Sequence, residues 1–320
     1  MTKDIVEKDF WVCWTLKRVF SLAAPPAGLL FKGGTSLSKA FGAIRRFSED
    51  VDLSFDRCGL GFGGADDPAN AKSGKKATAL LEDLQEECRR TIREELLPML
   101  AGAMAEALGE EPGATWTLGL DAEDKDQESI LFRYPQAPGG GTGYVASQVR
   151  LELGARSDHW PTHQARVVPY AGEDFPRLFK EAGCVMKVLA GKRTFWEKAT
   201  ILHQWHHAPE GKLFRDRLSR HYYDVAMLAG HAIGTEALAD PGLLVEVAKH
   251  KKLFFPAAWA RYDEAKPGTL RLVPPESRLA TLEADYGKMR EMLFGDVPGF
   301  AWIIERLRVV EEAVNAATGG

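Results

Sequence analysis

Two aspartates separated by a single residue, Asp50 and Asp52, stand at the start of the apolar segment "DVDLSF". In a β-strand alternate side chains share a face, so both carboxylates are expected on one side and Val51 and Leu53 on the other, toward the core. Two neighbouring carboxylates repel each other unless cations lie between them, and hard divalent cations prefer oxygen ligands. The pair is therefore predicted to hold one or two Mg²⁺ ions that bridge a phosphate.

Two glycines, Gly33 and Gly34, precede the acids in the same stretch, "FKGGTSLSKAFGAIRRFSEDVDLSF". Glycine lets the backbone approach a phosphate closely. The start of the helix expected after it offers free N–H groups and the positive end of a dipole. Thr35 or Ser36 is available as the cap of that helix. The stretch is thus predicted to bring a phosphate and a metal ion together.

Each of these features alone has a plainer interpretation, because a lone Asp-x-Asp is most often a pair of solvated acids and a lone Gly-Gly is most often a turn. Their order is more specific. A strand, Gly-Gly-Thr-Ser, a short helix and Asp-x-Asp on the next strand resemble the motif of the polymerase-β-like nucleotidyltransferases. The segments "GGTSLSKAF" and "RFSEDVDLSF" are most similar to the AbiEii/AbiGii toxin family of bacterial type IV toxin–antitoxin and phage-abortive systems.

The resemblance continues in "RTFWEKATILHQ" and "SRHYYDVAML", and covers about residues 30 to 230. It implies two further working residues, Lys198 as the cation for the triphosphate and Asp224 as a group that orients Lys198 or the nucleotide. The plainer alternatives are a surface lysine and an ion pair within one helix between Arg220 and Asp224.

A third carboxylate usually completes the metal site of this fold family, and Glu152 in "QVRLELGARS" is the candidate. Arg150, Glu152 and Gly154 would share one face of a strand, although any half-exposed strand shows the same alternation. Ser48 either caps the loop before the acids or accepts a phosphoryl or nucleotidyl group. The predicted nucleotide-binding residues are Gly33, Gly34, Thr35, Ser36, Lys39, Arg46, Ser48 and Lys198.

The secondary structure expected around these residues changes along the chain from mixed strands and helices to helices alone. Strands are expected in "GLLF", "VDLSF", "TWTLGL", "SILFRYP", "GYVASQVRLELGA" and "ARVVPY", and only helices from about residue 176, the first of them in "VMKVLAGKRTFWEKATILHQWHH". We therefore expect an α+β fold in which residues 1–175 form the lobe with the acids and residues 176–320 form a helical lobe. The resemblance implies that the first lobe is polymerase-β-like, with a mixed sheet.

Composition sets the remaining bounds. The chain has 320 residues, 45% of them hydrophobic, four scattered cysteines and a formal net charge of -4. It lacks an apolar run long enough for a membrane span, so we expect a cytoplasmic protein. His203 and His207 are expected at an exposed helix end and not at a metal. RNA contact requires a local basic surface, for which the candidates are Lys187, Lys192, Arg193, Arg215, Arg217 and Arg220.

Together these features predict a Mg²⁺-dependent nucleotidyltransferase that uses a nucleoside triphosphate. The family resemblance implies a toxin that modifies RNA, with the 3′ end of tRNA as the leading acceptor, and an antitoxin encoded beside it. Two other classes stay open: a metal-dependent phosphohydrolase or nuclease, and a binding protein on a decayed transferase fold. Transfer to a protein or a small molecule is a further alternative.

Overall fold

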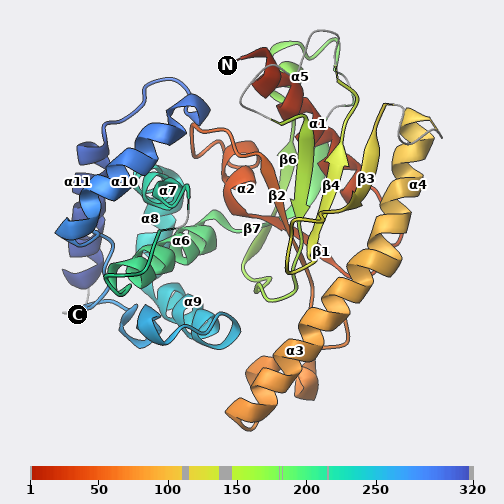
Figure 1. The fold of residues 1–320 in the computed structure, drawn as a ribbon. Helices are drawn as coiled ribbons and strands as arrows, with labels where there is room; N and C mark the ends of the chain where they lie inside the picture. The colour runs from red at the N-terminus through yellow and green to blue at the C-terminus, as the bar shows by residue number, and fades with distance from the viewer. Residues whose placement is uncertain are drawn as a thin grey trace. The chain divides into compact units, whose positions relative to one another are not determined.

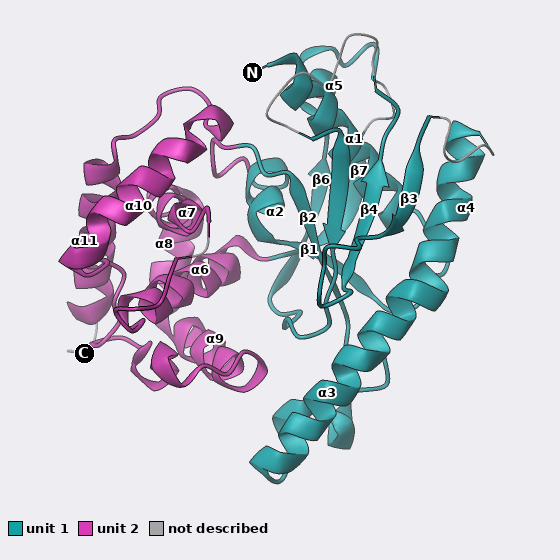
Figure 2. Cartoon of the chain, viewed as in Figure 1, with its two compact units in different colours: residues 1–41, 47–189 teal, residues 42–46, 190–320 magenta. Residues whose placement is uncertain are grey.

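The computed structural model describes residues 2–109, 115–136, 146–179, 181, 183–214 and 216–316. The chain forms two compact units, shown in Figure 2: unit 1 comprises residues 1–41 and 47–189, and unit 2 comprises residues 42–46 and 190–320. The division therefore falls after residue 189 and not after residue 175, because one more strand belongs to the first unit. The short segment 42–46 also joins the second unit, which no local sequence pattern indicates.

A single mixed sheet of seven strands organises unit 1 (Figure 1). The strands are β1 (Leu29–Lys32), β2 (Asp50–Phe55), β3 (Thr117–Leu120), β4 (Ser129–Arg133), β5 (Gln148–Glu152), β6 (Thr162–Val167) and β7 (Cys184–Leu189). Their order is β3-β4-β5-β2-β1-β7-β6, with β2 parallel to β5, β1 parallel to β7 and the other pairs antiparallel. The sheet and its helices confirm the expected α+β class.

The seventh strand corrects the expectation of a helix that begins near Val185. Met186 and Val188 are buried while Val185 and Lys187 are exposed, which is the alternation of a strand with one covered face. The strand pairs with both β1 and β6. The helix that follows begins only at Gly191, so the apolar segment comprises a strand and a helix.

Unit 1 also contains α1 (Lys3–Phe20), α2 (Gly33–Lys39), α3 (Gly74–Thr91), α4 (Leu97–Leu108) and α5 (Tyr170–Asp174). A π-helical turn, Ile92–Leu96, joins α3 to α4, so the two form the long continuous rod seen beside the sheet in Figure 1. The helix α1 packs on β5 and β7, whereas α2 packs on β1 and β2. The helix α2 thus lies against the strand that carries the acids, and α1 lies against one of that strand's two neighbours, β5.

Unit 2 is helical in its described residues, with α6 (Gly191–His206), α7 (Ser219–Leu228), α8 (Ala232–Leu238), α9 (Pro241–Phe254), α10 (Glu276–Lys288) and α11 (Phe300–Ala316). The helix α6 packs against α7, α8 and α9, and α7 packs against α10 and α11. Segment 42–46 is held here by a bridge between Arg46 and Leu293. None of the described helices has the length and apolar character needed to cross a membrane.

The end of α6 differs from the exposed helix end expected around His203 and His207. His203 is 0% exposed, and its Nδ1 atom accepts a hydrogen bond of 3.0 Å from the backbone N–H of Arg271. The Nε2 atom lies 3.1 Å from the carbonyl oxygen of Arg261. Burial lowers the pKa of His203 to about 4. His203 is therefore a neutral core residue that satisfies two backbone groups.

Candidate active site

The two acids of unit 1 lie on one face of β2, as the alternation predicts. Val51 and Leu53 are 0% and 1% exposed, whereas Asp50 and Asp52 are half-buried. The strand lies between β1 and β5 in the sheet. Its carboxylates are consequently fixed by a rigid element with neighbours on both sides.

Gly33 is required at its position by both backbone conformation and space. Its φ angle is +78°, and a Cβ atom built on it would lie 1.9 Å from Asp52 Oδ2 and 2.8 Å from Asp52 Cβ. Real Cβ atoms do not approach other atoms so closely, and the left-handed conformation is unfavourable for residues other than glycine. The backbone at Gly33 and the carboxylate of Asp52 therefore occupy one tight cradle.

The neighbouring strand brings Glu152 beside this cradle. Because β5 runs parallel to β2, Asp50 pairs in register with Arg150 and Asp52 pairs with Glu152. Paired residues of adjacent strands share a face of the sheet. Arg150 is engaged elsewhere, since its guanidinium lies 2.6 Å from Asp121 Oδ2. Glu152 is thus the acid that the sheet places next to Asp52.

These oxygen donors fit a divalent cation in chemical type, because hard cations take carboxylate ligands. The cradle at Gly33 also leaves backbone, without a side chain, against Asp52. Within the ranges that the structure describes, no group of three or more His, Cys, Asp or Glu side chains gathers closely enough to hold a metal. The fit therefore depends on Asp50 and Asp52, and Glu152 stays a predicted third ligand.

The hydroxyls of α2 do not cap the helix, which corrects that expectation. The helix begins at Gly33, and Lys32 at its N-cap position makes no side-chain cap. Thr35 instead donates from Oγ1 to the carbonyl oxygen of Ser48 at 3.3 Å and contacts that of Asp50. Ser36 donates to the carbonyl oxygen of Gly33 at 2.9 Å. Thr35 thereby ties α2 to the chain that leads into β2.

Lys39, predicted to contact the nucleotide, lies in a buried ion pair. Its side chain is 3% exposed, and its Nζ atom lies 2.9 Å from Asp9 Oδ1 on α1. The same ammonium group lies 3.4 Å from the centre of the Tyr170 ring. The structure therefore assigns Lys39 to the contact between α1 and α2 and not to the face of Asp50 and Asp52.

Unit 2 brings three of the predicted residues together: Arg46, Lys198 and Asp224. Asp224 is fully buried and accepts hydrogen bonds from Arg46 Nε at 2.7 Å and Arg46 Nη2 at 2.8 Å. Lys198 Nζ lies 2.9 Å from Asp224 Oδ2. Asp224 thus contacts Lys198, as expected of a residue that orients it, and its partners are not on its own helix. Arg46 is 4% exposed and belongs to this cluster.

Charge explains why this cluster is stable although it is buried. Burial by itself raises the pKa of Asp224, but the charges of Arg46 and Lys198 outweigh it and hold that pKa well below its usual value. Burial lowers the pKa of Lys198, with Asp224 opposing this effect and Arg46 adding to it. Asp224 is therefore the shared counter-charge of both cations.

The residues predicted for the basic surface differ in exposure and pairing. Arg193 is 1% exposed and contributes little surface charge, which corrects the prediction for that residue. Lys192 is paired with Asp240 at 2.8 Å. Lys187 is exposed on β7 in unit 1, and Arg215 lies outside the described residues.

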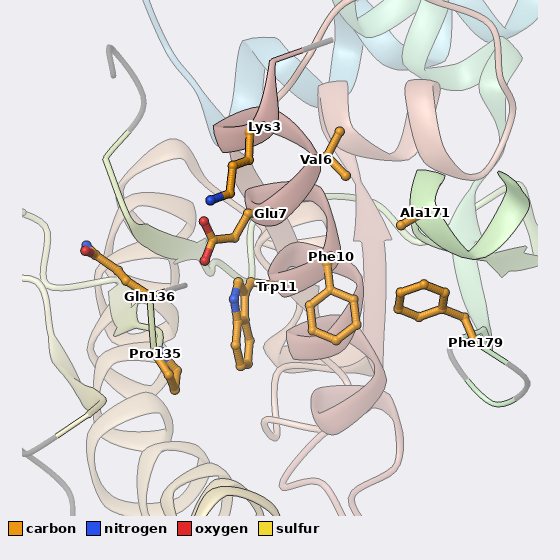
Figure 3. A pocket seen from close by; sticks show the side chains of 9 residues that line it. All are labelled: Lys3, Val6, Glu7, Phe10, Trp11, Pro135, Gln136, Ala171 and Phe179. Carbon is orange, nitrogen blue, oxygen red and sulfur yellow. The ribbon is translucent and has the colours of Figure 1, made fainter. Parts of the chain in front are cut away.

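A separate cavity of about 640 Å³ lies on unit 1, along α1 (Figure 3). Its lining is mainly apolar: Lys3, Val6, Glu7, Phe10, Trp11, Pro135, Gln136, Ala171 and Phe179. None of the predicted site residues lines it. We therefore keep this cavity apart from the candidate active site.

Comparison with known proteins gives a family match over most of the chain. A profile of the family described as nucleotidyl transferase AbiEii toxin, type IV toxin–antitoxin system, matches residues 14–306. MenT4, a nucleotidyltransferase toxin from Mycobacterium tuberculosis H37Rv, aligns with 16% identity and a TM-score of 0.51 over 96% of this chain and 84% of its own.

Two solved structures from Helicobacter pylori also align, each with 12% identity. JHP933 has a TM-score of 0.46 over 99% of this chain and 94% of its own. A further protein, described as a nucleotidyltransferase, has a TM-score of 0.47 over 100% of both chains. No curated protein matches the chain by sequence.

Proposed function

Because the chain belongs to the AbiEii nucleotidyltransferase toxin family, we propose that it transfers a nucleoside monophosphate from a nucleoside triphosphate to an RNA, at the 3′ end of tRNA. The observation that supports this most directly is the cradle of unit 1, where Asp52 lies against Gly33 and β5 brings Glu152 alongside. A cognate antitoxin would restrain the activity, and the cytoplasm, where the triphosphates and tRNA occur, would be its place.

The reaction forms a bond between the acceptor hydroxyl oxygen and the α-phosphorus and breaks the bond to pyrophosphate, while the hydroxyl loses its proton to solvent. Asp50 and Asp52, with Glu152 as the predicted third ligand, would hold Mg²⁺, which would supply the positive charge that such phosphates require. The chain itself supplies placement: β2 fixes both carboxylates on one face, and Gly33 keeps side-chain atoms away from Asp52. Placement of this kind is the main source of catalysis in phosphoryl and nucleotidyl transfer.

We assign to Lys198 the role that the family motif implies, a cation for the triphosphate. Its contact with Asp224 supports this assignment, because a lysine held by a carboxylate keeps its ammonium group in one place. Arg46 and Asp224 are then positioning residues for Lys198. Nothing in this assignment requires Lys39, which is paired with Asp9.

Incubation of the full chain with Mg²⁺, total RNA and each labelled nucleoside triphosphate in turn tests the proposal. We expect label in RNA of tRNA size, released pyrophosphate and no label on periodate-oxidised tRNA, which has no intact terminal hydroxyls. Equal labelling of oxidised tRNA would overturn the 3′-end acceptor but not nucleotidyl transfer. Label on protein or on a small molecule alone would replace RNA as the acceptor. Release of monophosphate, or cut strands without incorporation, would instead identify a phosphohydrolase or nuclease.

A further inference from the structure

Two consecutive charged residues of α1, Lys8 and Asp9, are buried in unit 1 at 2% and 1% exposure. Charged side chains are almost never fully buried unless they are paired. Neither residue belongs to the nucleotidyltransferase motif described above. Their partners, however, lie in the two halves of that motif: Lys39 at the end of α2 and Glu49 just before β2.

Lys8 contacts the acid strand. Its Nζ atom donates a hydrogen bond of 2.8 Å to Glu49 Oε2, and the Lys8 side chain is 3% exposed. Glu49 directly precedes Asp50, the first residue of β2. The buried ammonium group therefore holds the chain at the point where it enters the strand that carries Asp50 and Asp52.

Asp9 contacts the other half of the motif. Its Oδ1 atom lies 2.9 Å from Lys39 Nζ, at the last residue of α2, and its Oδ2 atom accepts a hydrogen bond of 2.6 Å from the backbone N–H of Tyr170. The helix α2 begins at Gly33. Asp9 therefore holds the far end of the helix whose first residue forms the cradle for Asp52.

Thr35 adds the third contact of this set, which joins α2 directly to the start of β2. Its hydroxyl bonds the carbonyl oxygen of Ser48 at 3.3 Å and contacts that of Asp50, so α2 is tied to the start of β2 as well as to α1. The backbone of Gly33 lies against Asp52, since a Cβ atom built on Gly33 would be only 1.9 Å from Asp52 Oδ2. Reacting groups must be held within roughly 0.5 Å of their working positions.

The β1–β2 ladder already brings Gly33 beside Asp52, because Lys32 pairs with Asp52. We infer that Lys8 and Asp9 are positioning residues, which fix the position of α2 relative to the start of β2 by holding both to one helix. This inference rests on the proposed function in one respect, namely that the face of Asp50 and Asp52 is the catalytic face. The buried pairs are directional, whereas apolar contacts of the same volume are not. Replacement of the pairs by apolar side chains therefore restores packing without restoring register.

The first experiment compares Lys8→Met with Arg57→Met in the full chain. Arg57 is a matched control, since its side chain is 13% exposed in unit 1 and pairs with Asp67 and Asp158, just beyond the end of β2 opposite to Asp50. We expect both variants to melt at lower temperature. Only Lys8→Met should lower kcat, by about 10- to 100-fold, as is found for other residues that orient a site. Its KM for the triphosphate should change by less than about threefold. Equal kcat in the two variants would overturn the role of Lys8.

The second experiment separates positioning from the cost of an unpaired buried charge. Asp9→Asn removes the charge but keeps an oxygen that can accept from the Tyr170 N–H, and it should lower kcat to a similar extent. The double variant Asp9→Leu with Lys39→Met leaves no unpaired charge. Recovery of the melting temperature without recovery of kcat supports positioning, and recovery of both shows that the pair is merely structural.

A readout without nucleotide or metal completes the test. Amide hydrogen exchange in Lys8→Met and Asp9→Asn should be faster than in the wild type for residues 33–39 and 48–52, and unchanged for residues 74–91 of α3. Unchanged exchange in the first two segments would overturn the inference. If the wild type transfers no nucleotide, the proposed function fails, but exchange still decides whether Lys8 and Asp9 set the register of α2 and β2.

Discussion

Asp50 and Asp52 add nothing to the core, since Val51 and Leu53 fill the buried face of β2. Asp50→Asn and Asp52→Asn should therefore each leave the fold intact and lower nucleotidyl transfer by orders of magnitude, because a bound metal loses a charged ligand in either case. Turnover of labelled triphosphate and circular dichroism melting measure the two effects. Asp66→Asn, at an exposed acid of the same unit, is the control and should keep wild-type turnover. Near-normal turnover in either β2 variant would remove that aspartate from the metal site.

Gly33 allows a prediction that separates backbone strain from steric conflict. Gly33→Ala should destabilise the chain by about 1–2 kcal/mol through its left-handed conformation, and should also displace Asp52 and abolish most transfer. Gly61 has φ +91° with nothing within 4 Å of a built Cβ atom, so Gly61→Ala carries the strain alone. Urea unfolding and kcat of the two variants provide the comparison. Comparable kcat values would show that the space beside Asp52 is not used.

Lys198 contacts Asp224 through a compact ammonium group, which another cationic side chain would not reproduce. Lys198→Ala should raise KM for the triphosphate by a larger factor than it raises the Mg²⁺ concentration needed for half-maximal activity. Lys198→Arg should not restore the wild-type value, because a forked guanidinium does not fit the place of a compact ammonium group. Steady-state kinetics at several Mg²⁺ concentrations measure both quantities. A KM unaffected by either change would assign Lys198 to stability alone.

At the scale of elements, Asp224 joins α7 to α6 through Lys198 and to segment 42–46 through Arg46. The cost of leaving two buried cations without their acid is about 3–5 kcal/mol, so Asp224→Asn should destabilise the chain by that amount at neutral pH. This holds whatever the reaction, since the contacts are internal to unit 2. The cluster therefore links segment 42–46 to α6 and α7 through hydrogen-bonded ion pairs, whose geometry is more specific than that of apolar packing.

The same cluster predicts how stability depends on pH. The folded pKa of Asp224 lies below its ordinary value, so its contribution is fully present above the unfolded pKa of about 3.9 and is lost as pH falls toward the folded pKa. Urea unfolding between pH 6 and pH 2 should show this loss in the wild type and a shallower dependence in Asp224→Asn. Glu246→Gln, at an exposed acid of unit 2, is the control. The same acid dependence in all three proteins would contradict the assignment.

At the scale of the whole molecule, a net charge of -4 means that binding of tRNA must depend on local cations. Lys187 is exposed on β7, so Lys187→Ala should raise KM for tRNA and lower the slope of log KM against log salt by about one. Lys252, paired with Asp263 at an exposed site, is the matched control. KM for tRNA between 50 and 200 mM salt tests this, and identical slopes in both variants would exclude Lys187 from the RNA surface.

The elements that were predicted correctly are those whose faces follow from local periodicity. The alternation of acids and apolar residues around Val51 specifies β2, and most other strands and helices follow from similar patterns. The strand β7 was missed because its alternation runs directly into an apolar helix, so the local pattern has no break at Leu189. The caps predicted at Thr35 and Ser36 failed because α2 begins at Gly33, where the close approach of Asp52 demands glycine.

The sequence by itself determined that two acids share one face of a strand and follow a glycine pair, and its family resemblance singled out a lysine and an aspartate in later helices. Only the tertiary structure decided their partners. Arg46 bonds Asp224 across a separation of 178 residues, and Lys39 pairs with Asp9 and not with a phosphate. Local patterns encode which face a side chain takes, since this depends on the period of one element. The choice of a buried charge's partner depends on which distant elements pack together, and on the desolvation that this packing imposes.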